Sequence, residues 1–215
     1  KSLLGLYLAK LEKQAAAKTG DKYTPAAQAS LRLQKRISGA DLAEEDLAFF
    51  NNIIDVEGID FRTVGDNPHW VTKFTLLDDY PEMKKLFTSI SLQILKEVAG
   101  VEKIKITTSW LTAIEPNANP TLHRHSNSWF SGVYYFQDSY SGLEFKNPIE
   151  RDIDLKNGKL TGNWKLQPEK NMLVFFPSYL YHKIEKNTSD EVRHSLAFNI
   201  MPDGATGKVD SEFVY

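Results

Sequence analysis

Residues 123–136, HRHSNSWFSGVYYF, place two histidines two positions apart at the start of an apolar, aromatic run. The whole chain of 215 residues has only five histidines. The run that follows the pair is rich in aromatic residues, which favour strands. Because residues i and i+2 of a strand project from the same face, we predict that His123 and His125 point together and that Arg124 points away.

Similar runs recur throughout the C-terminal half, where the hydrophobic period is two. They are KIKITTSWLTAI (103–114), SGVYYF (131–136), LEFKNP (143–148), NMLVFFP (171–177), LYHKIEK (180–186) and EVRHSLAFNI (191–200). Glycine, proline, asparagine and aspartate separate them, which is typical of strands joined by turns. Short strands at this regular spacing predict a barrel or a two-sheet jelly roll.

The first part of the chain has helical spacing instead. Apolar residues recur on one helix face over residues 4–15. A second helix is predicted over residues 24–37, where Thr24 can cap and a proline follows at the first helical position. A third is predicted over residues 38–54, which start with a capping-box pattern.

One more helix is predicted to begin at Asp79, as the capping residue, and to end at Gly100. A short β-prone run over residues 69–77 precedes it. Helices before and strands after indicate the α+β class, a β core with helical support. We therefore predict a helical extension over residues 1–60, packed on the core, and a β domain over residues 61–215.

Composition excludes several classes of function. The chain has no cysteine, which excludes disulfides, zinc–thiolate sites and cysteine nucleophiles. The formal net charge is -2, so no basic excess points to nucleic acid as a partner. No apolar run approaches the length of about 20 residues that a membrane-spanning helix needs. We expect a cytoplasmic protein that binds neither nucleic acid nor membranes.

The histidine pair needs a third ligand to hold a metal. Imidazole suits borderline metals such as Fe(II), Ni(II), Cu(II) and Zn(II). His182 is the candidate, because it follows the strongly apolar run that ends in VFFP and a Pro-Ser turn. This position predicts that His182 lies at the start of the next strand, where a ligand can reach a cavity.

The last apolar run contains Arg193 and, two residues later, Ser195. Strand alternation puts both on one face and His194 on the other. An arginine on the inner face of a β core is costly unless it meets an anion. Its planar fork suits a carboxylate, to which the Ser195 hydroxyl can add a hydrogen bond. The pattern therefore predicts a metal with a carboxylate anchor beside it.

The ordered set HRHSNSWFSGVYYF, VFFPSYLYHKI and RHSLAFNI resembles the 2-oxoglutarate- and Fe(II)-dependent oxygenase superfamily. It is most similar to small oxygenases of bacteria and phages and more remotely similar to prolyl hydroxylases. The resemblance covers roughly residues 101–202, and the order and spacing of the motifs make it more specific than any single motif. It implies a double-stranded β-helix, or jelly roll, whose sheet is supported by helices.

The resemblance also implies roles for particular residues. His123 and His182 match the first and the distal metal ligand. Arg193 matches the residue that anchors the C5 carboxylate of 2-oxoglutarate, and Ser195 and Tyr135 match residues that bind the same co-substrate. The implied cofactors are Fe(II), 2-oxoglutarate and O2. The implied reaction is hydroxylation of an acceptor, for example a protein side chain such as proline, with release of succinate and CO2.

The sequence departs from the family at position 125, which is histidine where the family usually has aspartate or glutamate. Three interpretations stay open. In the first, His125 binds the metal and completes a neutral three-histidine face. In the second, His125 starts the motif, Asn127 replaces the carboxylate, and His123 is not a ligand. In the third, the site is degenerate and binds metal poorly. A missing carboxylate leaves more positive charge on the metal, which strengthens the binding of an anionic co-substrate and weakens that of the metal alone.

Two other classes of function compete with the oxygenase. A cupin-like metalloprotein would use three histidines without 2-oxoglutarate, and it leaves Arg193 without a purpose. A non-catalytic β-helix used for interaction would bind no metal. Asn127 and Trp129 lie near the histidine motif and are candidates for substrate contacts. His69, like His194, is expected to be a hydrogen-bonded structural residue.

Overall fold

The computed structural model describes residues 34–36, 62–64, 67–138, 141–146, 154–155, 158–159, 163–207 and 209–214. The helices predicted over residues 4–15 and 38–54 lie outside the described residues. So does most of the helix predicted over residues 24–37. The described part begins, in sequence, with three residues of strand.

The described elements are mainly antiparallel strands. The strands are β1 (Gln34–Arg36), β2 (Arg62–Val64), β3 (Asn67–Val71), β4 (Ile104–Ile114), β5 (Phe130–Tyr135), β6 (Leu143–Phe145), β7 (Asp154–Leu155), β8 (Gly158–Lys159), β9 (Trp164–Leu166), β10 (Met172–Pro177), β11 (His182–Ile184), β12 (Arg193–Pro202), β13 (Ala205–Thr206) and β14 (Phe213–Val214). The helices are the 3₁₀ turns η2 (Leu76–Asp78) and η3 (Val209–Ser211) and the long helix α4 (Pro81–Ala99).

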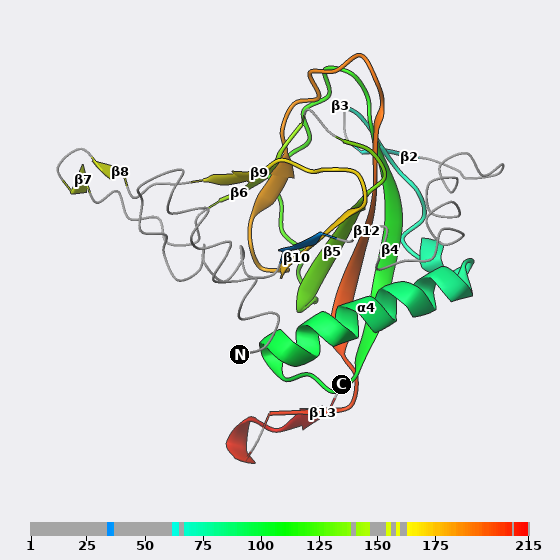
Figure 1. Ribbon diagram of the computed structural model, residues 1–215, viewed down its shortest axis with the longest axis vertical. Helices are drawn as coiled ribbons and strands as arrows, with labels where there is room; N and C mark the ends of the chain where they lie inside the picture. Colours follow the sequence, from blue (N-terminus) through cyan, green and yellow to red (C-terminus); the bar gives the residue numbers. More distant parts are fainter. Residues whose placement is uncertain are drawn as a thin grey trace.

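A seven-stranded sheet in the order β1-β10-β5-β12-β4-β3-β2 forms the larger layer, and α4 crosses one of its faces (Figure 1). Alternation along β12 divides its side chains between the two faces. Leu196, Phe198 and Ile200 face α4 and join Phe87 and Leu95 of that helix in the main apolar core. The alternate residues Arg193, Ser195, Ala197 and Asn199 therefore face the opposite side of the sheet.

A three-stranded sheet in the order β11-β6-β9 forms the smaller layer. A second apolar cluster joins the two sheets: it combines Tyr135 and Phe176 from the larger sheet with Leu143 and Phe145 from the smaller one. The isolated antiparallel bridge between His123 and His182 continues the smaller sheet beyond β11. The ends of several strands therefore meet between the two sheets.

Helix α4 confirms the helix predicted before the strands, with one correction at its start. It ends at Gly100, whose φ of 66° is the left-handed conformation that glycine adopts without steric cost. The N-cap is Tyr80 rather than Asp79, and no side chain caps the first turn. Asp79 is instead the C-cap of the preceding 3₁₀ turn η2, and its backbone N–H donates within that turn.

The strands predicted from the two-residue period are present as β4, β5, β6, β10, β11 and β12. Residues 34–36, predicted as helix, are a strand instead and pair with residues 172–174 of β10. An edge strand presents a row of backbone N–H and C=O groups that a neighbouring segment can satisfy by pairing. This pairing joins segments far apart in the sequence, so the helical spacing of residues 24–37 did not indicate it.

Among the described residues, no helix has both the length and the apolar character needed to cross a membrane.

Candidate metal centre

The two histidines of the HRH motif precede β5 rather than lie on it, which corrects the single strand predicted over residues 123–136. A turn at residues 126–127 separates them from β5, and Asn127 adopts a φ of 61° there. A left-handed residue interrupts the extended backbone that a continuous strand would need. The prediction that His123 and His125 lie together is nevertheless confirmed by their contact, described next.

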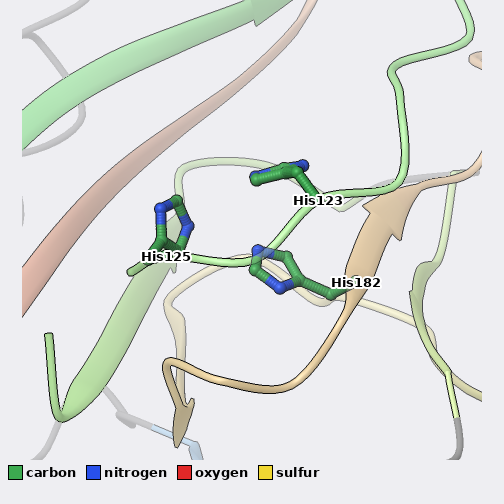
Figure 2. Close-up of side chains that lie close together, drawn as sticks. All are labelled: His123, His125 and His182. Atoms are coloured by element: carbon green, nitrogen blue, oxygen red, sulfur yellow. The ribbon is translucent and has the colours of Figure 1, made fainter. Parts of the chain in front are cut away.

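His123, His125 and His182 form a cluster whose ligand nitrogens all lie within 4.8 Å of one another. The ring centres of His123 and His182 are 4.5 Å apart, and each is 5.1 Å from that of His125 (Figure 2). Solvent exposure decreases across the cluster: His123 is exposed, His125 is half-buried and His182 is buried. The three residues thus form a possible metal site.

Backbone hydrogen bonds hold the two segments of the cluster side by side. The N–H of His123 donates to the carbonyl of His182 at 2.9 Å, and the N–H of His182 donates back at 2.8 Å. The N–H of His125 donates to the carbonyl of Ser178 at 3.0 Å. The turn between β10 and β11 is therefore fixed against the HRH motif, as a site built from two distant segments requires.

Two of the rings have a fixed tautomer. Nδ1–H of His182 donates to the carbonyl of Leu180 at 2.8 Å, and Nδ1–H of His123 donates to that of Thr121 at 3.0 Å. A carbonyl oxygen only accepts, so each Nδ1 carries the proton and leaves the lone pair on Nε2. Such second hydrogen bonds are the usual way in which proteins orient histidine ligands for a metal.

The surroundings favour neutral imidazoles. Burial, with the nearby His123 ring, lowers the pKa of His125 to about 4. Burial is also the main cause that lowers the pKa of His182 to about 3, again with His123 second. Neutral imidazole is the form that binds metals. No carboxylate belongs to the cluster within the described part of the chain, so the cluster brings no negative charge to a bound metal.

The cluster fits a divalent metal. Metal–imidazole bonds of about 2.1 Å put neighbouring ligand nitrogens about 3 Å apart. The ligand nitrogens of the cluster all lie within 4.8 Å of one another, so a bound metal would draw them closer together. Three imidazole ligands would leave further coordination positions of a bound ion open, as in sites that activate O2 at non-haem iron.

The histidines open into a cavity of about 290 Å³ between the two sheets. One part of its wall is apolar, with Phe74, Trp110, Val133, Leu143 and Ile184. The other part carries polar groups from the larger sheet; these are His69, Thr112, Tyr135 and Ser195. A mainly apolar cavity with a few convergent polar groups is typical of small-molecule sites.

Arg193 does not itself line the cavity but lies next to Tyr135, which does. Its guanidinium carbon is 5.0 Å from the ring centre of Tyr135, and both side chains are almost completely buried. Burial lowers the pKa of Arg193, while interaction with Tyr135 raises it. Burial raises the pKa of the Tyr135 hydroxyl, and the neighbouring guanidinium acts in the opposite direction. A buried cation therefore lies on the same side of the sheet as the histidine cluster.

Strand pairing explains why the predicted co-substrate residues meet. Ser195 of β12 lies opposite Tyr135 of β5 on one side and Thr112 of β4 on the other. Opposed residues in antiparallel strands share a face. Tyr134 and His194 alternate to the other face, and Tyr134 joins the core beside α4. The two-residue period was enough to predict this division.

Two predicted substrate residues do not reach the cavity wall. Asn127 is exposed in the turn before β5 and is absent from the lining. Trp129 is 40% exposed and packs edge-on against Phe130, with ring centres 6.2 Å apart. Both residues are close to the HRH motif in sequence, but the turn at residues 126–127 changes the direction of the chain, so neither lines the cavity.

Sequence reasoning missed His69. It lies on β3, lines the cavity, and its buried Nε2 has no hydrogen-bond partner within the described part of the chain. The hydrogen-bonded structural role expected for it is therefore not met at Nε2. Only the pairing of β3 with β4 brings this residue to the site, and a lone histidine near a proline carries no signal of that pairing.

Residues 108–199 match the model of a family described as "Putative 2OG-Fe(II) oxygenase". The matched segment runs from β4 to β12 and contains all three histidines and Arg193. The match confirms the resemblance to the 2-oxoglutarate- and Fe(II)-dependent oxygenase superfamily that those motifs carry. The sequence matches no curated protein.

Solved structures of 2-oxoglutarate-dependent enzymes share the fold. An oxidoreductase of the 2OG-Fe(II) oxygenase family from Burkholderia pseudomallei matches with a TM-score of 0.63 at 11% identity, covering 84% of this chain and 93% of that one. A Pseudomonas putida prolyl-4-hydroxylase matches with a TM-score of 0.53 at 17% identity, covering 79% and 91%. The epimerase SnoN, in complex with Fe3+, alpha ketoglutarate and nogalamycin RO, matches with a TM-score of 0.58 at 13% identity, covering 90% and 84%.

Proposed function

We propose that this protein is a 2-oxoglutarate- and Fe(II)-dependent dioxygenase that hydroxylates an acceptor substrate. The observation that carries the proposal is one cavity with a histidine cluster on one side and Tyr135 on its wall, next to the buried guanidinium of Arg193. A metal and the distal carboxylate of a diacid each have a matching partner there. The larger and smaller sheets would then be the two halves of a double-stranded β-helix, supported by helices that include the predicted extension over residues 1–60.

The metal would be held by Nε2 of His123 and His182, the nitrogens left free of protons by the backbone hydrogen bonds, and by a nitrogen of His125. When bound, Fe(II) and 2-oxoglutarate would supply the activation of O2: one oxygen atom would enter a C–H bond of the acceptor, and the other would enter succinate as the diacid loses CO2. The neutral donors leave the full positive charge of the metal to attract the two carboxylates.

Arg193 and its neighbours would orient the co-substrate. A guanidinium binds a carboxylate with parallel hydrogen bonds, and these bonds strengthen where water is excluded. Tyr135 and Ser195 lie beside it and can each add a hydroxyl hydrogen bond. The apolar wall near Phe74 and Trp110 would exclude water and receive the acceptor. A protein side chain such as proline is the acceptor class that we propose, supported by the prolyl-4-hydroxylase among the structural relatives.

The proposal is tested by conversion of 2-oxoglutarate to succinate with Fe(II) and O2, alone and with proline-containing peptides. His182→Ala should abolish succinate formation, because it removes the most buried ligand. His194→Ala is the matched control, since this histidine lies on the opposite face of β12, and it should keep wild-type turnover. Equal turnover by His182→Ala and wild type, or none by metal-loaded wild type with any acceptor, would contradict the proposal.

A cupin-like metalloprotein that does not use 2-oxoglutarate is a second candidate, because the cluster contains no carboxylate. The two functions differ at Arg193. Arg193→Lys should weaken 2-oxoglutarate binding to the Mn(II)-loaded protein at least about tenfold, the loss expected when a bidentate charged contact is removed. It should leave Mn(II) affinity unchanged. A metal site that binds no diacid, in wild type as in the variant, would favour the cupin-like function.

A further inference from the structure

His69 lies in register with Arg193 on the larger sheet. β3 pairs with β4 so that His69 is opposite Ile114, and Ile114 is opposite Arg193 on its other side. Residues directly opposed across antiparallel strands project from the same face. His69 and Arg193 therefore face the same side, two strands apart, and His69 forms part of the cavity wall.

The His69 imidazole lies within electrostatic reach of both ends of the proposed site. After burial, which is the largest cause, His123 and then Arg193 lower its pKa to about 4. A diacid that chelates a metal beside His123 and extends toward Arg193 must cross the space between these two residues. Among the described histidines that line the cavity, His69 is the one outside the metal cluster.

The Nε2 atom of His69 is buried and has no hydrogen-bond partner within the part of the chain that the structure describes. Buried polar atoms are nearly always paired with protein, water or ligand. Because this atom belongs to a residue that lines the cavity, a ligand in the cavity can supply the missing partner. A neutral imidazole with its proton on Nε2 can donate one hydrogen bond to a carboxylate oxygen.

We propose that His69 is a further co-substrate contact, whose Nε2–H donates to a carboxylate of 2-oxoglutarate bound between the histidine cluster and Arg193. This inference rests on the proposed function, because it needs the diacid to occupy the cavity. It gives His69 a role distinct from metal ligation, since His69 is not part of the cluster of close ligand nitrogens.

The test measures two affinities by isothermal titration calorimetry: Mn(II) for the metal-free protein, and 2-oxoglutarate for the Mn(II)-loaded protein. His69→Phe keeps the ring size and removes the donor. It should raise the dissociation constant of 2-oxoglutarate about tenfold or more, as expected for a lost hydrogen bond to a charged group. The dissociation constant of Mn(II) without the diacid should stay at the wild-type value.

Two further variants separate a binding role from a structural one. His69→Gln keeps an N–H donor on a side chain of similar length and should restore part of the 2-oxoglutarate affinity. His194→Phe makes the same replacement one position along β12 from Arg193 but on the other face, and it should bind the diacid like wild type. If His69→Phe is too unstable to titrate, the comparison of His69→Gln with an Ala variant at the same position decides.

Unchanged 2-oxoglutarate affinity in His69→Phe would overturn the inference and leave the proposed function intact. A parallel loss of Mn(II) affinity would also overturn it, because His69 would then act on the metal site. If Mn(II)-loaded wild type binds no 2-oxoglutarate, the proposed function fails and the inference fails with it.

Discussion

His125 sets the charge of the proposed metal centre. It occupies the position where the superfamily usually has a carboxylate, and its ring lies 5.1 Å from the rings of both other histidines. The alternative in which Asn127 supplies the ligand has less support, because Asn127 is exposed and absent from the cavity wall. With neutral ligands, the negative charge near the metal must come from the co-substrate, so metal and diacid should reinforce each other's binding.

This coupling predicts the effect of His125→Asp. The added carboxylate should tighten Mn(II) binding to the protein alone, because it adds an opposite charge at the site. It should also reduce the gain in Mn(II) affinity that 2-oxoglutarate produces. Titration calorimetry of Mn(II) with and without 2-oxoglutarate measures both effects. His125→Gln, a neutral control, should not tighten Mn(II) binding; equal coupling in His125→Asp and wild type would show that ligand charge does not control the site.

Arg193 illustrates what a single residue in the sequence could reveal. An arginine inside a two-residue apolar alternation predicted a buried cation facing an anion, and Arg193 is buried to 2% exposure. Ser195 was predicted to share a face with Arg193. The structure agrees, because Ser195 lies opposite Tyr135, whose ring the Arg193 guanidinium contacts. His69 could not be predicted in the same way, since its approach depends on the register of β3 against β4. Local periodicity fixes which way a side chain points but not which distant strand lies next to it.

At the level of elements, the close packing of β5 against β12 positions the site. Gly132 of β5 lies opposite Phe198 of β12, and a Cβ there would lie 2.4 Å from Cζ of Phe198. Because Gly132 has no side chain, the Phe198 ring can lie over β5 beneath α4. There it packs on Phe87, with ring centres 5.1 Å apart. The same two strands carry Tyr135 and Ser195 to the cavity. A larger residue at position 132 would therefore disturb both the core and the site.

Gly132→Ala should destabilise the protein by about 1–3 kcal/mol, the usual cost of overpacking a core. Urea unfolding followed by circular dichroism measures the change. In a Phe198→Leu background the cost should be smaller, because the ring that meets the added methyl group is gone. An equal cost in both backgrounds would show that Phe198 is not the residue that excludes a side chain at position 132.

Other elements show the limits of sequence reasoning at this level. The apolar segments predicted as strands became β4, β10 and β12. Burial fixes their conformation, and in β10 both faces are buried, with Leu173 and Phe175 in one apolar cluster and Val174 and Phe176 in the other. The HRH segment was predicted as strand, yet hydrogen bonds to Ser178 and His182 hold it outside β5. Strand β1 replaced part of a predicted helix, since it satisfies the edge of β10. In each case a long-range backbone partner outweighed local preference.

For the whole molecule, the buried neutral histidines link stability to pH. The pKa values of His69 and His125 are lowered to about 4 and that of His182 to about 3, mainly by burial. In the unfolded chain a histidine has a pKa of about 6.5. Below that pH the unfolded state binds more protons than the folded state, so protonation favours unfolding.

The metal-free protein should therefore lose stability as the pH falls from 6.5 toward 4. Each such histidine contributes at most about 1.4 kcal/mol per pH unit, and less for His69 and His125, which are partly solvated. Thermal unfolding in the presence of a chelator measures the slope. His182→Gln should flatten it, since the most buried of these groups no longer titrates. A melting temperature that is constant between pH 6.5 and 4.5 would contradict this linkage.

The most direct experiment is a crystal structure of the protein soaked with Mn(II) and 2-oxoglutarate. We expect Mn(II) bound to Nε2 of His123 and His182 and to a nitrogen of His125, with the diacid on the metal and its far carboxylate on Arg193. A metal bound without two of these rings, or a diacid that avoids Arg193, would contradict the proposed site.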